Sequence, residues 1–93
     1  MRPVFYVSDG TGITTETIGH SVLAQFQGVQ YHAHRIPFVD TPEKARQTAE
    51  IIGLQQSQSG QRAVVFTSLV DAEAHTVLAA TGALMLDVLT PFA

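Results

Sequence analysis

The richest cluster of polar side chains and glycines lies between Ser8 and Thr15. This segment combines two glycines with four hydroxyl side chains. Glycines let backbone amides approach a ligand closely, hydroxyl groups add hydrogen-bond donors, and a helix N-terminus contributes partial positive charge. Together these properties suit a phosphate or a carboxylate. The candidate anion-binding residues are Ser8, Asp9, Gly10, Thr11, Gly12, Thr14 and Thr15.

A purely structural role explains the same segment equally well on composition alone, because Ser, Asp, Gly and Thr also build turns and cap helices. Gly10 and Gly12 match the first two glycines of the dinucleotide-binding fingerprint, but Thr15 stands where its third glycine belongs. The chain also contains no Walker-type phosphate-binding run. These departures argue against a Rossmann cofactor and against an autonomous nucleoside triphosphatase site.

Acid–base chemistry and metal binding are two further possibilities for the polar residues. Asp9 could orient a metal-bound water, act as a base, or simply accept amide hydrogen bonds within its own turn. His32 and His34 fall on one face of an expected strand, but zinc sites need three or four ligands and the sequence supplies no third one beside them. We therefore expect a solvated strand face there and no metal site, and no catalytic residue is assigned.

Composition limits the classes of function. The 93 residues are 45% apolar and 14% charged, which suits one compact domain and is too little for two cores. A net charge of −3 with scattered basic residues argues against nucleic-acid binding. The chain has no Cys, no long apolar run and no signal-peptide pattern, so we expect a cytoplasmic protein without a membrane partner.

The elements that must position these residues alternate along the chain. Short apolar runs predict strands at residues 4–7, 29–39, 63–68 and 84–88. An apolar stripe of Ile18, Val22 and Phe26 predicts the buried face of a first helix. A second helix begins at Thr41, a third precedes Gly82, and the polar run at residues 55–61 is expected to be a surface connection.

Alternating strands and helices with short connections predict right-handed crossovers and a parallel sheet. The expected fold is a single α/β domain over residues 1–93. It is an open four-stranded parallel sheet of order 2-1-3-4 with helices on both faces, Rossmann-like or flavodoxin-like. Ligands of such sheets bind beyond the carboxyl ends of the strands. Ser68 follows the third strand at that edge and is a further candidate, although capping of the third helix explains Thr67 and Ser68 as well.

The run VFYVSDGTGITTETIGHS at residues 4–21 resembles the N-terminal signature of the phosphoenolpyruvate synthetase and pyruvate, phosphate dikinase regulatory proteins. The similarity continues through the segments at residues 36–39, 62–67 and 86–91 and so covers essentially the whole chain. The resemblance implies a bifunctional serine/threonine kinase and phosphorylase that switches pyruvate metabolism. It would phosphorylate a threonine of the target enzyme with ADP, and would remove that phosphate with inorganic phosphate, releasing pyrophosphate.

In that family the nucleotide-binding P-loop lies in a C-terminal kinase half, and no such motif stands in these 93 residues. We therefore expect an N-terminal domain that is inactive alone, holds no cofactor, and has its own kinase domain and the target enzyme as partners. Two alternatives remain open. One is a non-catalytic module that binds an anion or a nucleotide. The other is a docking or homodimerisation domain with an apolar seam of Met85, Leu86, Val88, Leu89 and Phe92.

Overall fold

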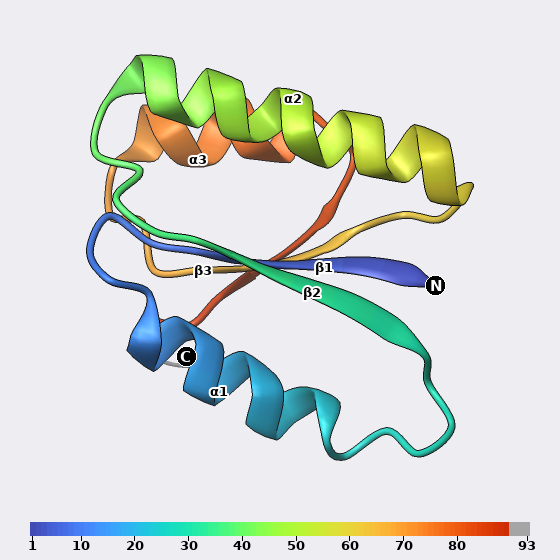
Figure 1. The fold of residues 1–93 in the computed structure, drawn as a ribbon. Coiled ribbons are helices and arrows are strands. Elements are labelled where there is room, and N and C mark those ends of the chain that lie inside the picture. Colours follow the sequence, from blue (N-terminus) through green and yellow to red (C-terminus); the bar gives the residue numbers. More distant parts are fainter. Residues whose placement is uncertain (90–93) are drawn as a thin grey trace.

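Four strands and three helices alternate along the chain in the computed structural model, which describes residues 1–89. They are β1 (Arg2–Val7), α1 (Ile13–Leu23), β2 (Tyr31–Ile36), α2 (Pro42–Ser59), β3 (Val64–Thr67), α3 (Ala72–Ala79) and β4 (Leu84–Asp87). The strands form one sheet in the order β2-β1-β3-β4, and every neighbouring pair is parallel. The helix α1 covers one face of the sheet, and α2 and α3 cover the other (Figure 1). The predicted α/β fold and strand order are confirmed.

The central strand β1 is buried on both faces, as its continuous apolar sequence predicts. Its residues pair in register with β2 on one side and β3 on the other, so that Phe5 lies opposite both His34 and Val65. Because side chains alternate along a strand, Phe5 and Val7 face α2 and α3, whereas Val4 and Tyr6 face α1.

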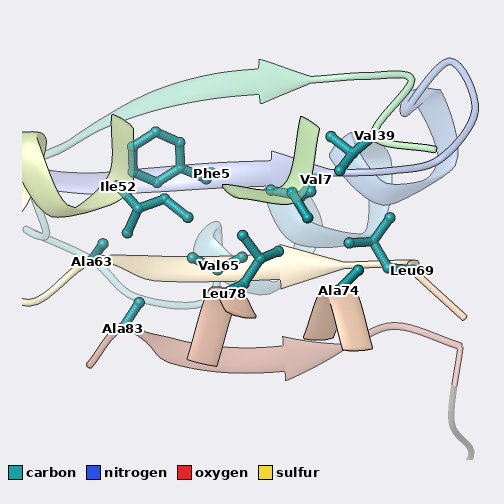
Figure 2. Packing of buried hydrophobic residues seen from close by; sticks show 11 residues of the cluster. Phe5, Val7, Val39, Ile52, Ala63, Val65, Leu69, Ala74, Leu78 and Ala83 are labelled. Atoms are coloured by element: carbon teal, nitrogen blue, oxygen red, sulfur yellow. The ribbon is translucent and has the colours of Figure 1, made fainter. Parts of the chain in front are cut away.

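The larger core lies between the sheet and the pair α2 and α3 (Figure 2). Phe5 and Val65 from the sheet meet Ile52 of α2 and Leu78 of α3 there, and all four side chains are fully buried. The start of α2 matches the sequence prediction, because the Thr41 hydroxyl accepts a hydrogen bond from the Lys44 amide and Pro42 opens the helix. This core holds the carboxyl ends of β1 and β3 in fixed positions.

The predicted buried face of α1 is wrong. The buried residues of this helix are Thr15 and Gly19, whereas Ile18 and Val22 are exposed, as is Phe26 just beyond the helix. Of the expected stripe, only Leu23 beside it is partly buried against the core on this face. The reason is close packing: a Cβ atom on Gly19 would lie 2.5 Å from Cε1 of Tyr6 and 3.0 Å from Cδ2 of Phe66. Small side chains let the helix approach the aromatic rings of the sheet, and its apolar stripe turns outward.

Most of the polar run at residues 55–61 is helical rather than a surface connection, and only its last two residues lie beyond the helix. The helix α2 continues to Ser59 and ends at Gly60, whose φ of 68° suits a left-handed helix cap. Gln56 has a structural role there. Its amide nitrogen donates to the Thr81 carbonyl at 2.9 Å, and its amide oxygen accepts from the Ala63 backbone N–H at 2.8 Å. Gln56 thus links α2 to the start of β3 and to the turn before β4.

The residues proposed to form one apolar seam lie on two faces of the sheet. Met85 packs against the core under α2 and α3, while Leu86 and Val88 pack with Tyr6 and Phe66 on the side of α1. Strand alternation separates them in this way. Leu89 is exposed, and Phe92 lies outside the described residues. Among residues 1–89, no helix is long and apolar enough to cross a membrane.

Candidate functional site

The loop between β1 and α1 carries most of the candidate anion-binding residues and lies at the carboxyl edge of the sheet, as predicted. Ser8 is 6% exposed, and its hydroxyl accepts a hydrogen bond from the Gly10 backbone N–H at 3.0 Å. Gly12 is the N-cap of α1 with φ 82°, and no side chain caps this helix. The first backbone N–H groups of a helix have no partner within it. The N-terminus of α1 therefore offers donors to an anion.

Thr15 and Ser68 meet at the buried base of this loop. Thr15 is 1% exposed, and its hydroxyl donates to the Ser68 hydroxyl at 2.8 Å. The structure thus joins two candidates that lie 53 positions apart in the sequence. Capping of α3 does not explain Ser68, because the carboxylate of Asp71 is the cap and accepts from the Ala74 N–H. The Thr67 hydroxyl accepts from the Leu69 N–H within a turn.

The connection from β2 to α2 fixes the shape of the loop. The Phe38 N–H donates to the Gly10 carbonyl and the Val39 N–H donates to the Ser8 carbonyl, both at 2.8 Å. Phe38 has φ 60°, a left-handed conformation that is uncommon for a residue other than glycine. Two backbone hydrogen bonds therefore brace the candidate loop from a neighbouring connection.

Arg35 packs beside the loop, and the sequence analysis did not select it. Its Cγ and Cδ atoms lie 3.2 Å from the position that a Cβ on Gly12 would occupy. Its Nε is 3.9 Å from a carboxylate oxygen of Glu16 in the first turn of α1, and both side chains are partly exposed. The register of the parallel strands could have indicated this position, because Arg35 pairs with Tyr6 near the carboxyl end of β2, close to where the loop begins. A guanidinium therefore stands beside the uncapped helix end.

A sequence model described as Kinase/pyrophosphorylase matches residues 4–93. The chain belongs to this family. Curated relatives include proteins of Stenotrophomonas maltophilia (strain R551-3), 53% identical, and of Xanthomonas oryzae pv. oryzae (strain MAFF 311018), 52% identical, each over 92 residues. Both carry the name "Putative phosphoenolpyruvate synthase regulatory protein". The alignments cover 99% of this chain but 34% of each relative, so the chain spans about a third of their length.

Acidic side chains line a neighbouring cleft of this family member. Asp9, Asp40 and Asp71 border a cavity of about 160 Å³ between the first loop and the starts of α2 and α3. Asp40 accepts a hydrogen bond from Lys44 Nζ at 2.9 Å, and this bond lowers the pKa of its carboxyl group. Carboxylates repel an anion from this cleft. Within residues 1–89, no group of three or more His, Cys, Asp or Glu residues could hold a metal ion.

A second, more polar groove of about 470 Å³ runs between α1 and β2 on the other side of the loop. Arg35 and Glu16 stand at its loop end, and the buried Tyr6 lies in its lining. Burial raises the pKa of the Tyr6 hydroxyl, with smaller contributions from Tyr31 and Glu16, so Tyr6 is a neutral hydrogen-bonding group near neutral pH. In this groove, Tyr6 and Arg35 place hydrogen-bond donors from β1 and β2 beside the loop.

Of the two strand histidines, His32 is exposed, as expected, whereas His34 is half-buried. The ring of His34 stacks on Phe5 with centroids 5.4 Å apart, and the ring of His32 lies 4.9 Å from that of His34. The Nε2 atom of His34 is buried without a hydrogen-bond partner. These contacts place the pair on the face of the sheet that carries α2 and α3, away from Arg35. The remaining candidates Asp9, Thr11 and Thr14 are exposed on the loop and the first turn of α1.

Proposed function

We propose that this chain forms the N-terminal part of a bifunctional regulatory kinase and phosphorylase that acts on phosphoenolpyruvate synthase or pyruvate, phosphate dikinase. The observation that carries the proposal is the family match over residues 4–93, together with the names of relatives that are 51–53% identical. In the kinase direction, a threonine hydroxyl of the target attacks the terminal phosphorus of ADP, and AMP leaves. In the opposite direction, inorganic phosphate attacks the phosphothreonine, which yields pyrophosphate and the free hydroxyl.

Within that activity, the loop from Ser8 to Thr15 binds a phosphate group of ADP or inorganic phosphate. Two features support this role: the uncapped N-terminus of α1 and the side chain of Arg35 packed beside Gly12. Backbone N–H groups and a helix dipole stabilise an anion at such a position. The domain binds and orients the phosphate, and the nucleophile and base come from elsewhere in the assembly.

Phosphate binding is tested by an NMR titration of the isotope-labelled chain with ADP, phosphate and pyrophosphate in turn. We expect saturable amide shifts confined to residues 8–15. Arg35→Gln should weaken binding about 10- to 100-fold, because a charge-assisted hydrogen bond is worth about 1.5–3 kcal/mol. Arg46→Gln, which removes an exposed charge from α2, is the matched control and should change nothing. Absence of shifts at millimolar ligand would assign phosphate binding to the rest of a family-length protein.

The regulatory activity is tested with phosphoenolpyruvate synthase as substrate. A chimera that joins this chain to the C-terminal two thirds of the Stenotrophomonas maltophilia relative is incubated with the enzyme and ADP. Mass spectrometry should detect a phosphothreonine on the synthase, and added phosphate should remove it with release of pyrophosphate. The 93-residue chain alone should produce neither change. Phosphorylation by the isolated chain would refute the assignment of catalysis to residues outside it.

A further inference from the structure

The outward stripe of α1 forms part of an apolar groove at the opposite end of the domain from the candidate loop. Phe26, just beyond the helix, is 59% exposed, and Leu84 at the start of β4 is 42% exposed. The groove between them has a volume of about 730 Å³. Its apolar lining comes from the end of α1, the segment that follows α1, and the strands β3 and β4.

This groove is where the sheet lacks a cover. Parallel sheets in α/β proteins bury both faces under helices. The pair α2 and α3 covers one face, whereas α1 is the only helix on the other face among residues 1–89 (Figure 1). It packs against β1 and β3. The start of β4 therefore keeps an uncovered apolar side, which favours docking of a further element.

Two arginines give the rim of the groove a positive charge. The side chain of Arg2 donates to the Arg62 carbonyl at 2.6 Å, and the side chain of Arg62 donates to the Gly82 carbonyl at 2.7 Å. Neither guanidinium lies in a salt bridge with a carboxylate of residues 1–89. An occupant of the groove should therefore combine an apolar stripe with carboxylates at the end that meets these arginines.

We propose that the groove receives an amphipathic helix from the two thirds of a family-length protein that this chain does not align with. The unaligned region makes up about two thirds of the relative, which is long enough to provide a further helix for this face of the sheet. A second copy of this domain fits less well, because a twofold interface brings the same patch together and would offer the arginines no carboxylate. The groove lies at the amino ends of the strands, away from the loop between β1 and α1, so its role does not depend on phosphate binding there.

Cysteine labelling tests the proposal, because the natural chain contains no Cys. Phe26→Cys and the matched control Leu54→Cys are prepared in the isolated chain and in the chimera with the Stenotrophomonas maltophilia region. Phe26 and Leu54 are 59% and 56% exposed, and Leu54 lies on α2 away from the groove. Labelling is followed by mass spectrometry of the peptide that carries the introduced Cys.

In the isolated chain, both cysteines should react at similar rates. In the chimera, Phe26→Cys should react at least tenfold more slowly, while the rate for Leu54→Cys stays unchanged. Equal rates for Phe26→Cys in the two proteins would overturn the proposal. Protection of Phe26→Cys in the isolated chain that grows with protein concentration would also overturn it, in favour of a second copy. If the chimera does not fold, the same comparison is made in the intact relative, with Cys at the two aligned positions.

Discussion

Because α1 packs closely on the sheet at Gly19, a larger side chain there should lower the free energy of unfolding. Replacing a helical glycine by alanine ordinarily stabilises a helix by about 1 kcal/mol. At Gly19, however, the new methyl group would lie 2.5 Å from a ring atom of Tyr6, which itself packs against Phe66. Overpacking of this kind costs about 1–3 kcal/mol, and so short an approach places Gly19 in the upper half of that range, which exceeds the gain. We expect Gly19→Ala to lower the free energy of unfolding by about 1–2 kcal/mol.

Gly53 provides the matched control, because it also lies inside a helix but has nothing within 4 Å of its Cβ position. Gly53→Ala should raise the free energy of unfolding by about 0.5–1 kcal/mol. Urea unfolding followed by circular dichroism measures both variants against the natural chain. The melting temperatures should move in opposite directions, by about 4–8 °C per kcal/mol. If Gly19→Ala is as stable as Gly53→Ala, the packing of α1 on Tyr6 described here is wrong.

Three further predictions concern side chains that fix the fold. Gln56→Ala should destabilise the chain by about 1–3 kcal/mol in urea unfolding, because it leaves the Ala63 N–H and the Thr81 carbonyl without their partner. The exposed Gln58 is the control, and Gln58→Ala should have little effect. Burial raises the pKa of Tyr6 above 10.0, so the neutral hydroxyl stabilises the fold fully below that pH, and this contribution is lost as the pH rises further. Above about pH 10, Tyr6→Phe should therefore lose less stability than the natural chain in pH-dependent melting curves. Asp71→Ala removes the cap of α3 and should cost about 1 kcal/mol, while Asp71→Asn should retain most of the stability.

The composition of the strands was enough to predict the architecture. The apolar run from Val4 to Val7 indicates a strand buried on both faces, and Thr41 with Pro42 indicates a helix start. These are local signals that depend on neighbouring residues. Alternation of strands and helices, with right-handed crossovers, then limits the possible strand orders to a few, including the one observed.

The tertiary structure decided which side chains of these elements meet. The stripe from Ile18 to Phe26 reads as a buried helix face, yet Gly19 is the residue that packs against the sheet, because the rings of Tyr6 and Phe66 leave room only for a hydrogen atom. The prediction failed there because sequence periodicity does not contain the size of the opposing side chains.

For the candidate site, the sequence predicted a loop of glycines and hydroxyls that follows a buried strand and precedes a helix, and the structure has that loop between β1 and α1. The sequence did not show that Arg35 lies beside Gly12 or that Thr15 bonds to Ser68, because each contact joins the start of α1 to the end of a strand that comes later in the chain. Such contacts depend on the register and spacing of parallel strands, which are set by packing of the whole sheet rather than by any local pattern.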